Sequence, residues 1–449
     1  MNFAFILCLL ILIIPIFILL IKKKENAFLL LMSLVFLISW IADELLLVPH
    51  FFTWSIETII LILFINYLLP KVIFLRKIEI PPFGKYILLL ITYVLFGGFI
   101  YFINFSDVLL GLRTFFKYTF LFLIFINSNF LKESYKKFFR YWLYFMAVQP
   151  FIALFQYFIL GHTDDLVCGT LLSTSIAAVL LIIFILCLID LINQEKVNNY
   201  VLYFLIFLSM SVIPIFGEAK AFFYLLPIVF VVRYVDSLLK MNYKNILQFI
   251  LPFLFVLYLF QSFYNVNLFQ LGEINTSNFL FSQNKGGIEA FDAQQTLAVS
   301  LSERFLSIVS LYNAGFLGGD LKRFFFGDGI GSHIFNYEAR EIFSLSTSES
   351  FMQKYSLSNF IQNMGLIGFL IFCFLLLRIS HYSYKASFIV KDQFFKSIYS
   401  IIPAFSILFL LSMFYTDPFA DTISFSYWFF VSSLMYLPKL KNETIEYST

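Results

Sequence analysis

The sequence has few of the residue types that soluble proteins expose or that metal and disulfide sites need. Only 13% of its residues are charged, about half the share found in typical soluble domains. Three of the four cysteines lie inside apolar runs and only Cys168 falls near the end of one, so neither a disulfide framework nor metal-ligand spacing is present. The net charge is +3 and the basic residues are dispersed, which argues against nucleic acid as a partner.

Apolar residues are in large excess. Hydrophobic residues make up 61% of the chain, 64 residues are Phe, and the mean hydropathy is +0.89. The composition predicts an all-α polytopic membrane protein with about 12–13 transmembrane helices. The spans are expected at 3–21, 27–47, 51–69, 86–104, 115–130, 139–160, 171–189, 200–216, 221–238, 246–264, 359–377, 398–414 and 422–437.

One long polar stretch, 265–357, interrupts the apolar runs. It divides the chain into about ten helices over 1–264, a long and partly helical loop, about three helices over 358–438, and a tail over 439–449. Chemistry is expected in the loop, because charged side chains are expensive within the bilayer.

The distribution of Lys and Arg predicts the orientation. Most of the 30 basic residues fall in alternate short loops, and such loops collect positive charge on the cytoplasmic side. The long loop is therefore expected outside and the C-terminal tail inside. The outer side would hold only Arg113, Lys117, Lys220, Lys285, Arg304, Lys322, Arg323, Arg340 and Lys354.

Within the loop, one segment has the spacing of an amphipathic helix. Its apolar residues recur every three or four positions: Leu297, Leu301, Phe305, Ile308 and Tyr312. Such a helix would lie on the membrane surface. Arg304 sits at the edge of the apolar stripe, where it can either snorkel to a lipid headgroup or hold a phosphate. Glu303, beside it, lies off the apolar stripe.

A glycine-rich segment follows, Gly327-Asp328-Gly329-Ile330-Gly331-Ser332. Glycines at alternate positions permit a tight backbone path whose N–H groups can hold an anion, although an ordinary turn has the same spacing. The segment is not a P-loop, because no Lys-Ser/Thr pair follows it.

Two pairs of charged residues stand near predicted outer span ends. Glu218 and Lys220 lie at the tip of a tight helical hairpin, where both can serve one site only if the tip is non-helical. Arg113 and Lys117 are one helical turn apart, so they share a face and could hold one anionic group together. The alternative for each pair is anchoring at the membrane interface.

These features together resemble the oligosaccharide repeat unit polymerases, usually called O-antigen polymerases, which are related to the O-antigen ligases. The resemblance rests on the many spans, the late outer loop, the segment from Phe326 to Ser332, and the span entry Ser358-Asn359-Phe360-Ile361-Gln362-Asn363-Met364-Gly365-Leu366-Ile367-Gly368. The chain departs from the family in two places. Ser358 stands where many relatives have His, and Lys220 stands where Arg is expected, which loses the planar bidentate fork.

The resemblance implies transfer of a growing glycan from undecaprenyl pyrophosphate to a hydroxyl of another lipid-linked repeat unit, at the outer face of a bacterial inner membrane, with a flippase and a chain-length regulator as protein partners. No metal or other cofactor is needed, since cations can stabilise the pyrophosphate leaving group. Candidate bases are Glu218, His333 and Glu303. Candidate substrate-binding residues are Arg304, Lys220, Arg113, Lys117, Arg340, Gly327, Asp328 and Gly329.

Three other activities compete with this interpretation. A flippase for lipid-linked oligosaccharide also has a dozen or so spans, but its outer loops are short and its charges lie inside the bundle. A ligase would need the missing histidine. A glycosyltransferase that uses polyprenyl-phosphate sugars carries acidic residues on a long loop after its first span, where this chain has only a short connection at 22–25.

Overall fold

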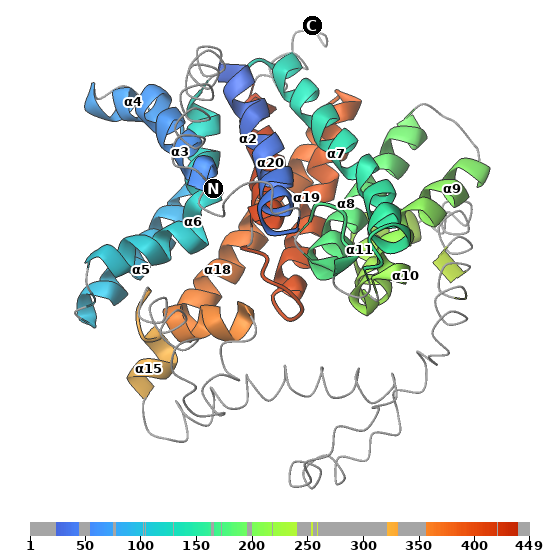
Figure 1. The fold of residues 1–449 in the computed structure, drawn as a ribbon. Coiled ribbons are helices and arrows are strands. Elements are labelled where there is room, and N and C mark those ends of the chain that lie inside the picture. The colour runs from blue at the N-terminus through green and yellow to red at the C-terminus, as the bar shows by residue number, and fades with distance from the viewer. Residues whose placement is uncertain are drawn as a thin grey trace, which may run out of the picture.

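The structure of the chain, a computed structural model, describes residues 24–44, 54–74, 78–101, 103, 105–128, 130–162, 166–171, 173–194, 200–217, 219–239, 253–254, 258, 321–330, 356–419 and 421–438. The described elements are all helices, packed as one bundle (Figure 1). Six of them have the length and apolar composition needed to cross a membrane: Ser55–Ile73, Ser106–Asn127, Lys132–Phe158, Thr174–Ile192, Asn359–Ile389 and Gln393–Ser412. The chain is therefore an all-α, multi-pass membrane protein.

The helices follow the predicted spans in order. They are α2 (Lys24–Ser39) with η1 (Trp40–Glu44), α3 (Ser55–Leu63) with η3 (Phe64–Leu68) and α4 (Leu69–Ile73), α5 (Gly84–Ile100), α6 (Phe105–Asn127), α7 (Lys132–Phe158), α8 (Thr174–Gln194), α9 (Tyr200–Met210) with α10 (Val212–Phe216), α11 (Lys220–Leu239), α18 (Ser356–Ile389), α19 (Gln393–Ser412) and α20 (Asp421–Ser432) with η7 (Ser433–Tyr436). The predicted spans 3–21 and most of 246–264 lie outside the described residues.

Several predicted boundaries were wrong. Helix α6 begins at Phe105 and not at 115, α7 begins at Lys132 and not at 139, and α18 continues to Ile389, well past 377. Hydropathy marks the stretch that suits lipid, whereas backbone hydrogen bonding continues into turns with polar side chains. The long loop is partly helical as expected, since α15 (Leu321–Phe326) lies within it.

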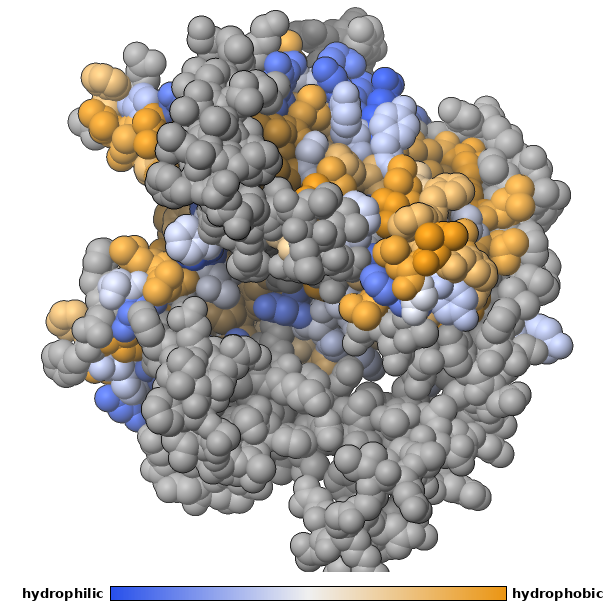
Figure 2. All heavy atoms as spheres, viewed as in Figure 1, coloured by the Kyte–Doolittle hydropathy of each residue, from blue (hydrophilic) through white to orange (hydrophobic). Residues whose placement is uncertain are grey.

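One end of the bundle, which we call the lysine-rich end, is fastened by polar contacts between distant helices. Lys24 donates to the carbonyl of Ser128, and Lys71 to the side chain of Asn127. Asp392 caps the start of α19 and also pairs with Lys136 of α7 at 3.4 Å. In Figure 2 much of the described surface is orange, and blue, hydrophilic residues are seen at this end, drawn at the top, as well as at the lower left. This arrangement agrees with the alternation of basic loops in the sequence.

The opposite end, the α15 end, holds the start of α6, the end of α5 and the start of α18 (Figure 1). The backbone N–H of Leu357 in α18 donates to Met413, just after α19, so α19 ends here as well.

Aromatic rings fill the core between the two ends. Phe28 of α2 lies 4.8 Å from both Phe125 and Phe138, and Tyr135 stacks on Phe429 at 4.9 Å. Trp142 is fully buried and its Nε1–H donates to Ser426 Oγ at 3.0 Å. Many of the Phe residues are thus packed between helices, where paired rings stabilise the fold by more than the burial of their apolar area alone.

Residues 167–171 of the connection between α7 and α8 are buried although their backbone is irregular. The backbone N–H of Gly169 donates to Gln156 Oε1 and its carbonyl accepts from Gln156 Nε2, both at 2.8 Å. Gln149 Oε1 accepts from the backbone N–H of Thr170 at 2.7 Å. Non-helical backbone at membrane depth is tolerated only where protein satisfies its polar groups, and here two glutamines of α7 do so.

The predicted orientation can be tested by labelling. In a chain whose four cysteines are replaced by alanine, Ser282→Cys and Ser348→Cys should react with a membrane-impermeant thiol reagent in intact cells. Lys137→Cys, exposed at the lysine-rich end, should react only after the cells are opened. Equal labelling of all three in intact cells would contradict the orientation.

Candidate functional site

The glycine-rich segment lies against the start of α18 at the α15 end. Gly327 and Gly329 have φ angles of 74° and 86°, in the left-handed region that glycine tolerates. Between them, the backbone N–H of Asp328 donates to the carbonyl of Gln362 in α18 at 2.7 Å. The two segments that carry the family resemblance, far apart in sequence, therefore meet in space.

Helix α18 is broken at the contact point. Gly365 has φ 67° and ψ 177°, a conformation that only glycine adopts readily. A break of this kind frees carbonyls that the helix would otherwise use. The Gln362 carbonyl accepts from the loop, as described, and the Met364 carbonyl accepts from the Tyr93 hydroxyl of α5 at 2.9 Å.

Gly327 and Gly365 also allow the two backbones to touch. A Cβ added to Gly327 would lie 2.5 Å from the backbone nitrogen of Gly365, and one added to Gly365 would overlap the carbonyl oxygen of Phe325. Tyr93 spans the junction, because its hydroxyl lies 3.3 Å from that same Phe325 oxygen and its ring stacks over Phe326. The junction therefore has no room for side chains at either glycine.

Two side-chain acceptors at the junction are buried without donors. Gln362 Oε1 and Asn363 Oδ1 accept no hydrogen bond from the described residues, and the two side chains belong to residues only 8% and 4% exposed. Asn363 uses its Nδ2 to donate to Asn359 of the same helix. Buried polar atoms in native proteins normally have partners, so these two oxygens are acceptors that the described residues leave unsatisfied.

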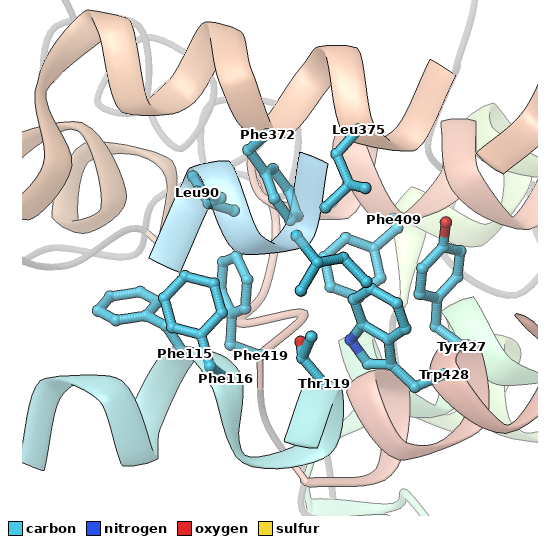
Figure 3. Close-up of a pocket in the computed structure, with 11 residues that line it drawn as sticks. Leu90, Phe115, Phe116, Thr119, Phe372, Leu375, Phe409, Phe419, Tyr427 and Trp428 are labelled. Carbon is cyan, nitrogen blue, oxygen red and sulfur yellow. The ribbon is translucent and has the colours of Figure 1, made fainter. Parts of the chain in front are cut away.

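Further into the bundle than this junction is a narrow, mostly apolar pocket between α5, α6, α18, α19 and α20 (Figure 3). Phe115, Phe372, Phe409 and Phe419 line it, and Thr119 is among its few polar groups. Phe360, one turn before Asn363, stacks on Phe419 with ring centroids 5.3 Å apart. Aromatic side chains therefore pack directly beside the polar junction.

Arg113 and Lys117 share a face of α6, as the sequence predicts, and they hold an anion that belongs to the protein. Arg113 Nη2 lies 3.0 Å and Lys117 Nζ 3.1 Å from Oε1 of Glu57 in α3. Phe115, on the other side of α6, contacts Phe360 of α18. The cation pair therefore faces α3 and not the junction at Gly365.

In the hairpin between α10 and α11, Gly217 and Ala219 lie outside the two helices. Helix α10 ends at Phe216, Gly217 caps it, and α11 begins at Lys220. A Cβ on Gly217 would meet the carbonyl oxygen of Val167 at 2.9 Å, so the tip packs against the buried α7–α8 connection. The structure describes the backbone of Lys220 as the first residue of α11, but it does not describe the side chain.

Glu218, Glu303, Arg304, His333 and Arg340 lie outside the described residues. Sequence reasoning missed Glu57, although a carboxylate inside a predicted span was a usable signal. It also missed Tyr93 and the unpartnered oxygens of Gln362 and Asn363, since no local pattern separates a Tyr or amide at a helix junction from the others in the chain.

No model of a known protein family matches this chain, and no curated protein shows detectable similarity to it.

Proposed function

We propose that the protein polymerises undecaprenyl-pyrophosphate-linked oligosaccharide repeat units at the outer face of a bacterial cytoplasmic membrane. One observation carries the proposal: the glycine segment of the long loop and the span entry that resembles the polymerase family meet at the break in α18. The unpartnered oxygens of Gln362 and Asn363 stand at that junction. A site of this kind suits a sugar lying across the end of a membrane bundle.

The reaction joins two repeat units without a redox step. The acceptor hydroxyl attacks the anomeric carbon of the donor, the bond from that carbon to the pyrophosphate oxygen breaks, and the polyprenyl pyrophosphate leaves with the electron pair. The hydroxyl proton passes to a base, for which Glu218, His333 and Glu303 are the candidates. Cations stabilise the charge on the leaving group, and Arg304, Lys220 and Arg340 are suited to this role.

A second candidate function is the flipping of the same lipid-linked units. The break in α18 at Gly365 favours it, because discontinuous spans commonly form the binding sites of transporters. The long outer loop favours the polymerase. A ligase would carry out similar chemistry on a different acceptor, without the histidine that Ser358 replaces.

Purified protein in proteoliposomes separates these functions. Supplied with one kind of lipid-linked repeat unit, a polymerase should produce a ladder of lipid-linked oligomers and release one polyprenyl pyrophosphate for each linkage formed. A flippase should leave the units single while moving them across the bilayer. Single units that remain on the side of addition would contradict both. In cells, loss of the protein should cause single units to accumulate at the outer face if it polymerises them.

A further inference from the structure

An ion cluster joins α3 to α6 outside the junction at Gly365. Three N–H donors converge on one oxygen, Glu57 Oε1: Arg113 Nε at 3.2 Å, Arg113 Nη2 at 3.0 Å and Lys117 Nζ at 3.1 Å. The other carboxylate oxygen, Glu57 Oε2, is buried and accepts no hydrogen bond from the described residues. Among the described residues, the cluster of Arg113, Lys117 and Glu57 carries two positive charges and one negative charge.

Arg113 remains open to a second anion. Its side chain is 43% exposed, against 12% for Lys117. Arginine has five N–H donors, and Nη1 of Arg113 donates to none of the described residues. The Trp54 ring lies 5.9 Å from the guanidinium carbon, close enough for a cation–π contact that holds the group in place.

The surroundings of the cluster are exposed and apolar, as expected of a span side that contacts lipid. Trp54 just before α3, Leu61 in α3 and Ile65 in η3 are 61%, 56% and 48% exposed, at the helical spacing of one apolar stripe. On α6, Leu109 is 48% exposed one turn before Arg113. Arg113 is two turns into α6, which corresponds to about 12 Å from its start. A charge on the lipid-contacting side of a span is expensive unless it has an anionic partner, and here two cations share the single carboxylate of Glu57 among the described residues.

We propose that the Arg113–Lys117 pair is a binding site for the phosphate of a lipid that reaches the protein laterally from the bilayer. The carboxylate of Glu57 holds the two cations in position when the site is empty, and the phosphate replaces it as the acceptor of their N–H groups. Arg suits phosphate because its planar fork matches two of the oxygens. Membrane glycerophospholipids and polyprenyl pyrophosphates carry the same group. Binding of the latter as substrate rests on the proposed function, whereas binding of the former does not.

Native mass spectrometry of the full-length protein in detergent tests the site. Three lipids are added to the protein separately at increasing concentration: phosphatidylglycerol, undecaprenyl pyrophosphate, and diacylglycerol as the control that lacks a phosphate. Arg113→Gln should weaken binding of phosphate-bearing lipids about fivefold, since each basic residue near an anionic lipid contributes about that factor. Glu57→Gln should strengthen it, because the amide competes less for the cations. Lys85→Gln, exposed at the lysine-rich end, is the control and should leave the Arg113-dependent binding unchanged.

The outcomes are distinct. Tighter binding of phosphatidylglycerol to Glu57→Gln identifies the site as one for membrane phospholipid, and a further preference for undecaprenyl pyrophosphate identifies the carrier as its ligand. If the cluster only fastens α3 to α6, Glu57→Gln will lower the melting temperature and bind phosphate-bearing lipid no better than the original chain, which would overturn the inference. If the original chain forms oligomers but Arg113→Gln binds lipid as well as the original chain does, the lipid-binding inference is contradicted and the proposed function is not. Arg113-dependent binding without any oligomer sinks the proposed function alone.

Discussion

Gly365→Ala should abolish polymer formation while the protein still reaches the membrane. A side chain at this position meets two obstacles. The φ of 67° with ψ of 177° is strained for any residue other than glycine, at a cost of about 1–3 kcal/mol. The added Cβ would also overlap the carbonyl oxygen of Phe325. The junction between α18 and the glycine segment should therefore separate, and the Gln362 and Met364 carbonyls should lose the donors described above.

Hydrogen exchange measures the structural part of this result and the proteoliposome reaction the functional part. Backbone amides of 321–330 should exchange faster in Gly365→Ala. The matched control is Gly97→Ala in neighbouring α5, because a Cβ there meets nothing within 4 Å and alanine is favoured over glycine within a helix. Normal polymer lengths together with unchanged exchange in Gly365→Ala would show that the junction does not matter.

Arg233→Met should destabilise the protein by about 3–5 kcal/mol, because it removes one partner of a buried ion pair. Asp190 of α8 is 5% exposed and accepts from Arg233 Nε at 3.2 Å and from the Tyr234 hydroxyl at 2.9 Å. Without the guanidinium, the Tyr234 hydroxyl is the one remaining donor to this carboxylate among the described residues. The change should appear as a lower melting temperature in detergent.

The double variant Asp190→Leu with Arg233→Met is the control for that prediction. Replacing both charges with apolar groups removes the desolvation penalty along with the attraction, and such exchanges are often neutral or stabilising. The double variant should therefore melt close to the original chain. A stable Arg233→Met, or a double variant no better than the single one, would mean that the pair contributes little.

Hydropathy was sufficient to predict the bundle but not its interruptions. The predicted hairpin of 200–216 and 221–238 nearly coincides with α9, α10 and α11, because long apolar runs leave the backbone little choice but helix in lipid. The break at Gly365 could not be predicted in this way. An average over a window treats Met364-Gly365-Leu366 as apolar, whereas the break depends on the approach of Phe325, forty residues earlier in the chain.

The candidate site was predictable only in its parts. The glycines at 327 and 329 were expected to permit either a tight backbone path or an ordinary turn, and both adopt left-handed φ angles. Their partner was not, since a hydrogen bond from Asp328 to Gln362 leaves no trace in local composition. Arg113 and Lys117 were expected either to hold an anion together or to anchor the span at the membrane interface. In the structure both pair with the carboxylate of Glu57. Spacing along one helix identifies which residues share a face, but only packing identifies what that face meets.

The buried connection between α7 and α8 has a practical consequence for handling the protein. Connections between helices are normally the safest places for an epitope tag, a fluorescent fusion or a protease site, because insertions there disturb little. In this connection Val167, Cys168 and Leu171 have no exposed surface, and the backbone at Gly169 is hydrogen-bonded on both sides to Gln156. An insertion at 167–171 would displace side chains that are packed inside the bundle, so reporter sequences belong elsewhere in the chain.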